Sequence, residues 1–446
     1  MSENNMVQSN GMQKEPTIYA ALNSYLSSIR GVGITSRIAL PHILNWTKNE
    51  LEELQREIER HVSNKIDPED EQGEEEAIIA FESAREFADF TSTMRKLDEI
   101  QGYNYLQVLS TSLFTQLFCE YDSFIGNLIA AIYRKNEALF KGITREISLS
   151  DLLEFDDLAS VKMSMLDKEI DTFRRDSYIE QFQSLEKKFS IKSLRKFAEW
   201  PDFVELAQRR NILTHNGGRV SEQYLHVCER EGYVFNVRPA IGEYRGIDHE
   251  YFDTANRLLS KVGLMLAFTL WSKVFPKEHE DIHRALNDTI FNCLLQKRWN
   301  MVAELVDFSL SEPMKKSISE INMRIRLVNS AIGLKFSGDQ ESAKNLLSSF
   351  DWTASYRDFK LAIAVLLDDY DEAVKIMKSI GKSGEIVNQA AYHTWPLFTE
   401  LREQPAFYEA YFTIYGEHYS EKVSTSKGTM EAHPSASVSV EKGGAI

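Results

Sequence analysis

LQVLSTSLFTQLFCEYDSFIGNLIAAI, residues 106–132, is the segment that decides the fold class of this chain. Phe114, Phe118, Ile125 and Ile129 recur at intervals that place them on one face of a helix. This apolar stripe predicts a buried core helix. The chain has only 10 prolines and 21 glycines, which favours helices over a turn-rich β architecture. We therefore predict a mainly all-α protein.

Asp122 interrupts this apolar stripe. A carboxylate in such a position costs free energy unless it is paired. One interpretation is a buried salt bridge or a charge at the edge of the helix. The other is that Asp122 partners and orients Arg210 or His215, with Glu120 as the alternative carboxylate.

A second informative segment is RRNILTHNGGR, residues 209–219, at the end of a helix that Pro201 is predicted to open. Arginine is a permanent planar cation that binds phosphate through two donors, and histidine exchanges protons near neutral pH. Asn211 lies four residues before His215 and shares its helix face. The Asn-Gly-Gly run stops the helix, so we expect His215 at an exposed rim.

These residue types suit RNA cleavage without a metal, because that reaction needs little more than a proton shuttle and a cation on the phosphate. A structural interpretation is also open, since cations stabilise the negative end of a helix. Arg210 and His215 are five residues apart, so an ideal helix directs them about 140° away from each other. Either Arg210 curls back, or a second protomer supplies the partner.

The motif and its surroundings resemble the HEPN superfamily, whose signature is Arg-x4–6-His, often with Asn directly after the Arg. Arg210-Asn211-x-x-x-His215 matches it, and counting from Arg209 gives Arg-x5-His. The resemblance covers roughly Gly102 to Phe275, with an apolar helix before the motif and an amphipathic helix after it. It implies a small helical bundle that pairs so that two motifs face one cleft. Many members are metal-independent endoribonucleases, and others only bind.

The same resemblance supports a role for Asp122, because HEPN domains often carry an acidic residue on an early helix. It implies Arg210, Asn211, His215 and Asp122 as catalytic residues, with no cofactor and no metal. Arg209 and Arg219 are the predicted substrate-binding residues. The implied partners are RNA and a second copy of the chain; DNA is not expected as a substrate, because it lacks the 2′-hydroxyl.

Overall charge limits the kind of nucleic-acid binding that this chain can show. The formal net charge of -16 argues against a general electrostatic grip on nucleic acid. One local patch, residues 187–196, holds five basic residues and no acid. It is either a solvated helix face or a surface that faces the substrate.

Cysteine usage and hydropathy indicate the compartment. Cys119, Cys228 and Cys293 are widely spaced, which fits neither a metal site nor a disulfide framework and favours a reducing environment. The polar N-terminus has no signal-peptide core. The most apolar run, residues 262–271, is shorter than the roughly 20 residues that span a bilayer. We therefore predict a cytoplasmic protein without a membrane segment.

With 446 residues, the chain is expected to hold two or three domains. The predicted divisions are a disordered N-terminus (1–14), an N-terminal helical region (15–100) with an acidic linker (67–76), the HEPN-like bundle (101–275), helical repeats (276–419) and a flexible tail (420–446). A short strand at 233–237 and a turn at 242–246 predict a small β-hairpin inserted in the bundle.

Residues beyond 276 change to a pattern of paired helices. Segments 298–306, 338–347 and 369–377 each follow an apolar helix and a turn, and each carries a small Ala where two helices would cross. This pattern is similar to degenerate tetratricopeptide (TPR) repeats. Such arrays form concave surfaces that bind protein segments; here they bind a protein or peptide ligand, or only extend the bundle.

His279-Glu280-Asp281-Ile282-His283 matches the His-Glu-x-x-His pattern of zinc peptidases. Charged residues surround it where those enzymes keep uncharged ones. The best third ligand, Glu304, is offset by about 13 Å along an antiparallel helix pair. We therefore expect no zinc, and interpret the motif as the exposed first turn of a repeat helix.

The function that these observations predict is a metal-independent HEPN-type endoribonuclease, a toxin or anti-phage defence effector with a repeat domain for sensing. The alternative is a non-catalytic scaffold in which the bundle dimerises and the repeats bind protein. The acidic surface suits this alternative.

Overall fold

The computed structural model describes residues 17–61, 81 and 83–420, and all its regular elements are helices. The predicted N-terminal segment 1–14, the linker 67–76 and the tail beyond residue 420 lie outside these residues. Contacts divide the chain into two compact units, Met1–Ala267 and Phe268–Ile446. The division falls inside one long helix rather than at residue 275.

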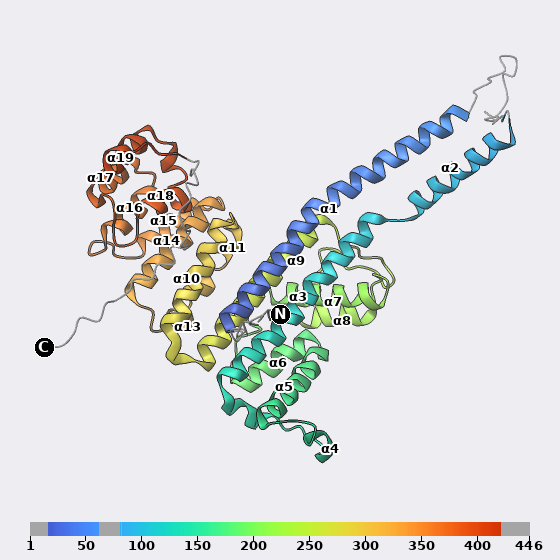
Figure 1. Cartoon of the computed structure of the whole chain (residues 1–446), viewed down its shortest axis with the longest axis horizontal. Coiled ribbons are helices and arrows are strands. Elements are labelled where there is room, and N and C mark those ends of the chain that lie inside the picture. Colours follow the sequence, from blue (N-terminus) through green and yellow to red (C-terminus); the bar gives the residue numbers. More distant parts are fainter. Residues whose placement is uncertain (1–16, 62–80, 82, 421–446) are drawn as a thin grey trace, which may run out of the picture. The chain divides into compact units, whose positions relative to one another are not determined.

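The first unit contains nine α-helices in the described residues, drawn from blue to yellow-green in Figure 1. They are α1 (Ile18–His61), α2 (Ala84–Gly102), α3 (Tyr105–Lys135), α4 (Leu149–Leu152), α5 (Leu158–Arg175), α6 (Tyr178–Phe189), α7 (Trp200–His215), α8 (Glu222–Arg230) and most of α9 (His249–Val274), with a 3₁₀ turn, η1 (Glu137–Gly142), after α3.

The apolar stripe of residues 106–132 forms the centre of this unit, as predicted. Phe114, Phe118 and Ile125 of α3 are almost completely buried. Helix α1 packs along α3, and Figure 1 shows α1 and α2 running side by side. Tyr25 of α1 stacks on Phe124 with the ring centroids 4.4 Å apart. The predicted N-terminal helical region and the bundle are therefore parts of one unit.

The predicted β-hairpin is wrong, because the described residues contain only two isolated bridges and no strand. The segment after α8 instead bonds back to the end of the motif. Val220 N donates to Glu243 O (2.9 Å) and Arg245 N donates to Gly218 O (2.8 Å). The side chains of Val234 and Val237 are 82% and 78% exposed, so their β propensity finds no second strand to pack against.

Helix α6 does not extend through the basic segment 187–196. It ends at Phe189, because Ser190 takes the left-handed conformation with φ of 52°. The basic segment 187–196 is therefore a helix end followed by a loop, and not a continuous helix face. Within this segment Arg195 is paired with Glu186, with Nε and Oε2 3.0 Å apart.

The second unit is a series of helix pairs, which agrees with the predicted solenoid-like arrangement. Its elements are η2 (Pro276–Glu278), α10 (His279–Leu295), α11 (Trp299–Glu304), α12 (Val306–Ser309), α13 (Glu312–Lys315), α14 (Glu320–Phe336), α15 (Gln340–Ser348), α16 (Arg357–Leu366), α17 (Tyr370–Ile380), α18 (Gln389–Thr394), η3 (Pro396–Phe398), η4 (Leu401–Glu403) and α19 (Pro405–Tyr415).

Helices α10 and α11, α14 and α15, and α16 and α17 pack as the pairs that the three similar segments predicted. Ala343 and Ala373 are buried in the second helices of the last two pairs. Gly333 of α14 lies against Val302 of α11, where a Cβ atom would overlap the valine side chain. Small residues therefore allow the close helix crossings that repeat arrays require.

No single helix in the described part of the chain has both the length and the apolar character needed to cross a membrane. Helix α9 and the segment Pro276–Leu295 satisfy the criterion only when the broken pair is taken together.

Candidate active-site groove

The end of α7 places His215 at the surface, as the Asn-Gly-Gly run predicted. The N–H groups of Asn216 and Gly218 both donate to the carbonyl of Ile212, at 2.8 and 2.9 Å. Gly217 and Gly218 have φ of 57° and 75°, a region that other residues rarely occupy. The last turn is therefore closed by backbone bonds, and the His215 side chain is left exposed.

Beside this helix end lies a groove of about 550 Å³. Its lining includes Asp122 from α3 and Arg210, Asn211 and His215 from α7. The structure thus brings all four predicted catalytic residues to one groove. Asp122 and Arg210 are 88 positions apart in the sequence, so packing of α3 against α7 creates this arrangement. Arg210 and His215 border the same groove although an ideal helix directs them apart.

Asp122 is held on one side by a hydroxyl and faces a guanidinium on the other. Tyr178, the first residue of α6, donates from its hydroxyl to Asp122 Oδ1 at 2.8 Å. Nη2 of Arg210 lies 4.0 Å from Asp122 Oδ2. Burial raises the pKa of Asp122, and the Tyr178 hydrogen bond and the charges of Arg210 and Arg174 only partly oppose this increase. The same burial raises the pKa of the Tyr178 hydroxyl, so it remains a donor.

Arg210 keeps donors available for a ligand. Its side chain is 26% exposed, and the 4.0 Å separation from Asp122 is too long for a hydrogen bond. Nη1 bonds only the neighbouring Asn211 Oδ1 at 3.3 Å, and Nη2 makes no hydrogen bond with the described residues, whereas Nε is buried and has no partner. An arginine with unused donors at the wall of a groove can bind an anion through two parallel hydrogen bonds.

Arg209, the neighbouring arginine, is a predicted substrate-binding residue that the structure places outside the groove lining. It is only 8% exposed, and Nε and Nη2 donate to Glu205 Oε1 at 3.1 and 2.8 Å. Nη1 donates to the carbonyl of Gly246 at 3.1 Å. The guanidinium also lies 4.6 Å from the ring centroid of Tyr251. These bonds connect α7 with the loop before α9, so Arg209 is a buried structural residue.

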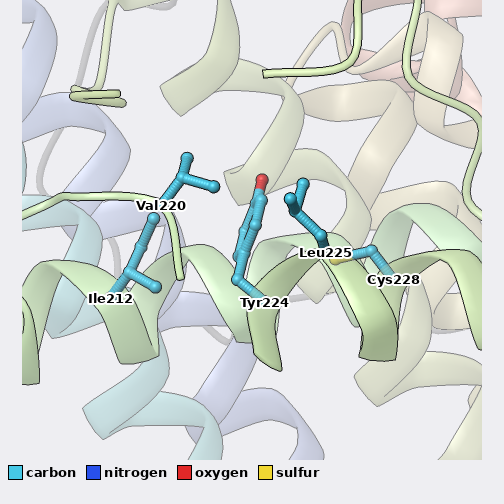
Figure 2. Close-up of a cluster of buried hydrophobic side chains, with 5 residues drawn as sticks. All are labelled: Ile212, Val220, Tyr224, Leu225 and Cys228. Atoms are coloured by element: carbon cyan, nitrogen blue, oxygen red, sulfur yellow. The ribbon is translucent and has the colours of Figure 1, made fainter. Parts of the chain in front are cut away.

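The buried side of the motif is completed by an apolar cluster. The side chains drawn together in Figure 2 are Ile212, Val220, Tyr224, Leu225 and Cys228. The Tyr224 hydroxyl donates to Glu205 Oε1, which also accepts from Arg209. This cluster and the buried carboxylate fix α8 against α7, directly behind the groove.

The other two predicted residues lie outside the groove. Arg219 is exposed, does not belong to the groove lining and donates to the carbonyl of Gly242 at 3.1 Å. Glu120, the alternative to Asp122, accepts from Gln116 at 2.7 Å and also does not line the groove. Of the two carboxylates, Asp122 is the one beside the motif.

Sequence reasoning missed three residues that complete the groove. They are Arg174 and Arg175 at the end of α5, and Tyr178 at the start of α6. Nothing in their spacing from the motif indicates this position. A capping box between Ser177 and Glu180 marks the start of α6, and that local signal alone could have placed a helix corner there.

The His-Glu-x-x-His motif opens helix α10. Glu280 and Asp281 in the first turn of this helix are exposed, whereas His283 is buried. Its Nε2 lies 3.0 Å from the carbonyl of Lys316, and Nδ1 lies 3.3 Å from Nη2 of Arg326. Because Arg326 can only donate, Nδ1 accepts and Nε2 carries the proton. Both ring nitrogens are thus occupied, and no group of metal-ligating residues is found among the residues that the structure describes.

Comparison with known proteins finds no matching protein-family model, no matching curated protein and no matching solved structure.

Proposed function

We propose that this chain is an endoribonuclease that cleaves RNA by attack of the ribose 2′-hydroxyl, with the chemistry of the HEPN families that its motif resembles. The observation that supports this proposal best is that Asp122, Arg210 and the exposed His215 share one groove. A proton-transfer group and a guanidinium with unused donors are the two functions that the reaction needs.

In the proposed reaction, neutral His215 accepts the proton of the 2′-hydroxyl. The 2′-oxygen forms a bond to phosphorus, and the bond from phosphorus to the 5′-oxygen breaks. The leaving 5′-oxygen receives a proton from a histidine in its charged form, and the other product carries a 2′,3′-cyclic phosphate. Protons and charges balance without another reactant.

The remaining groove residues have supporting roles in this proposal. Arg210 binds the scissile phosphate and stabilises the charge on its oxygens. Tyr178 fixes the Asp122 carboxylate through a hydrogen bond. Asp122 in turn orients the Arg210 guanidinium, whose Nη2 lies 4.0 Å from Asp122 Oδ2. Asn211, a hydrogen-bond donor and acceptor, orients His215 or the phosphate.

The resemblance implies a biological setting for this nuclease. A symmetric dimer would bring two grooves together and supply a second histidine for the leaving oxygen. The helix pairs of the second unit would bind a regulatory protein or peptide. A cytoplasmic toxin or defence nuclease that is held inactive until triggered fits this organisation.

The test is incubation of the purified chain with single-stranded RNA in EDTA. We expect cleavage products with 2′,3′-cyclic phosphate ends and no cleavage of a 2′-deoxy substrate. His215→Ala should reduce the rate about 10²–10⁴-fold, the usual contribution of an acid–base residue. His226→Ala is the matched control, because His226 is exposed on α8 but does not line the groove.

Equal loss in both histidine variants would contradict the proposal, and so would full activity in His215→Ala. The non-catalytic scaffold would instead be favoured if no RNA is cleaved. This result must hold for the dimeric protein and with a ligand bound to the helix pairs of the second unit.

A further inference from the structure

The end of α5 brings two consecutive arginines to the groove, and they are used differently. Arg174 Nε donates to the carbonyl of Asp122 at 3.0 Å, and its Nη2 donates to that of Ser123 at 3.4 Å. Its guanidinium lies against Gly126, in the space that a Cβ atom would need. Arg174 therefore fastens α5 to α3 and is occupied by protein groups.

Arg175 is exposed and lines the same groove. Within residues 17–61 and 83–420, no hydrogen bond or ion pair with protein involves its guanidinium, and it is therefore available for a ligand.

The backbone that carries Arg175 is held firmly in place. Ser177 N donates to Glu180 Oε2 at 3.0 Å, and Gln181 Nε2 donates to the carbonyl of Asp176 at 3.0 Å. On the next residue, the Tyr178 hydroxyl is bonded to Asp122. The corner between α5 and α6 is thus fixed to the helix that bears the Asp122 carboxylate. A rigid backbone with a free arginine is a typical arrangement for binding an anion.

The charged residues of the groove also favour the binding of an anion. The chain has a net charge of -16, yet three arginines, Arg174, Arg175 and Arg210, line this groove beside two carboxylates, Asp122 and Asp176. A volume of about 550 Å³ is within the roughly 300–1,000 Å³ of pockets that hold drug-sized ligands. The groove therefore has room for more of a strand than one reacting phosphate.

We propose that Arg175 forms a second phosphate subsite, which binds the phosphate next to the scissile one when a single-stranded RNA lies in the groove. This inference rests on the proposed function, because Arg210 and His215 define which phosphate is cleaved. Arg175 does not touch the reacting atoms, so it acts in binding and not in the chemical step.

The first experiment measures binding without cleavage. The His215→Ala chain and its Arg175→Gln derivative are titrated with a fluorescent 2′-O-methyl oligonucleotide at several salt concentrations. Loss of one phosphate contact should weaken binding about tenfold and reduce the slope of log K against log salt by about 0.7. Arg175→Lys should leave the slope of log K against log salt unchanged, because lysine keeps the positive charge. Arg134→Gln, an exposed arginine of α3 outside the groove lining, should also keep it.

The second experiment measures cleavage. In the otherwise unchanged chain, Arg175→Gln should reduce kcat/KM for an oligonucleotide about tenfold, through KM. It should not change kcat/KM for a dinucleoside monophosphate, which has only the scissile phosphate. An equal reduction for both substrates would overturn the subsite, and so would an unchanged salt slope.

The two proposals fail in different ways. If the salt slope falls but no RNA is cleaved, the phosphate subsite is supported and the nuclease is not. If RNA is cleaved while Arg175→Gln changes neither slope nor KM, the nuclease is supported and the subsite is rejected. No measurable oligonucleotide binding by the His215→Ala chain also rejects the subsite.

Discussion

At the scale of single residues, the adjacent arginines Arg209 and Arg210 have different surroundings and different proposed roles. Arg209 faces the interior and meets Glu205, two tyrosine rings and the carbonyl of Gly246. Neighbouring tyrosines and the carboxylate raise the pKa of Arg209, against the effect of burial, so it remains charged. Arg210 lines a groove, and its Nη2 makes no hydrogen bond with the described residues. Substitution of Arg209 should therefore affect stability much more than substitution of Arg210.

Arg209→Met is expected to lower the free energy of unfolding by about 3–5 kcal/mol, because it leaves the Glu205 carboxylate buried without its cation. Arg210→Met should change it by less than about 1 kcal/mol, since its contact with Asp122 is long and partly exposed. Urea denaturation followed by circular dichroism would measure both. Comparable destabilisation by the two substitutions would contradict this assignment of roles.

At the scale of elements, the second unit uses another buried arginine to join several short helices. Arg326 of α14 is 0% exposed, and its donors reach Asn287 Oδ1 on α10 (2.9 Å) and the carbonyls of Ser309 and Met314 (3.0 Å each). Burial lowers the pKa of Arg326 to about 10. The four-residue helices α12 and α13 are too short to be stable by themselves, and this arginine binds the carbonyl at or near the end of each.

Arg326→Met is expected to destabilise the protein by at least about 2 kcal/mol, because it leaves several buried acceptors without a donor. The matched control is Arg357→Met at the exposed start of α16, for which we expect less than about 1 kcal/mol. Thermal unfolding would show the difference. An Arg326→Met chain as stable as the control would show that the buried network contributes little.

At the scale of the whole molecule, the second unit is expected to lose stability in acid. In the second unit, burial lowers the pKa of His283 and of His393 from the ordinary value of 6.5. The unfolded chain therefore binds these protons more tightly than the folded chain does. The stability that neutral histidine contributes is complete above pH 6.5 and is lost as the pH falls from there toward the folded pKa.

We therefore expect the second unit to unfold at a lower temperature at pH 5.5 than at pH 7.5. One histidine contributes at most about 1.4 kcal/mol for each pH unit between its folded and unfolded pKa, which lowers the unfolding temperature by about 3–6 °C. His283→Gln should reduce the difference, because glutamine can donate and accept but does not titrate. Differential scanning calorimetry of the full chain at both pH values would measure it. An unchanged pH dependence in His283→Gln would show that the imidazole is not responsible.

The elements that sequence reasoning located correctly are those whose signals are local. The stripe of α3 follows from the helical period, and the end of α7 at His215 follows from Asn216 and two glycines. The paired helices of the second unit follow from recurring alanine-containing segments. The β-hairpin failed because a strand needs a distant partner, and the segment after α8 bonded instead to residues 218–220.

In the candidate site, too, local sequence signals predicted some features and only the packing of distant segments decided the others. By itself, the sequence determined that an arginine, an asparagine and a histidine stand near the end of one helix, because helical hydrogen bonds connect residues only four positions apart. Only the tertiary structure decided that Arg209 is buried while Arg210 faces a groove, and that Asp122, Arg175 and Tyr178 line that groove with it. Burial and contact between distant segments depend on how the helices pack, and no local spacing encodes that packing.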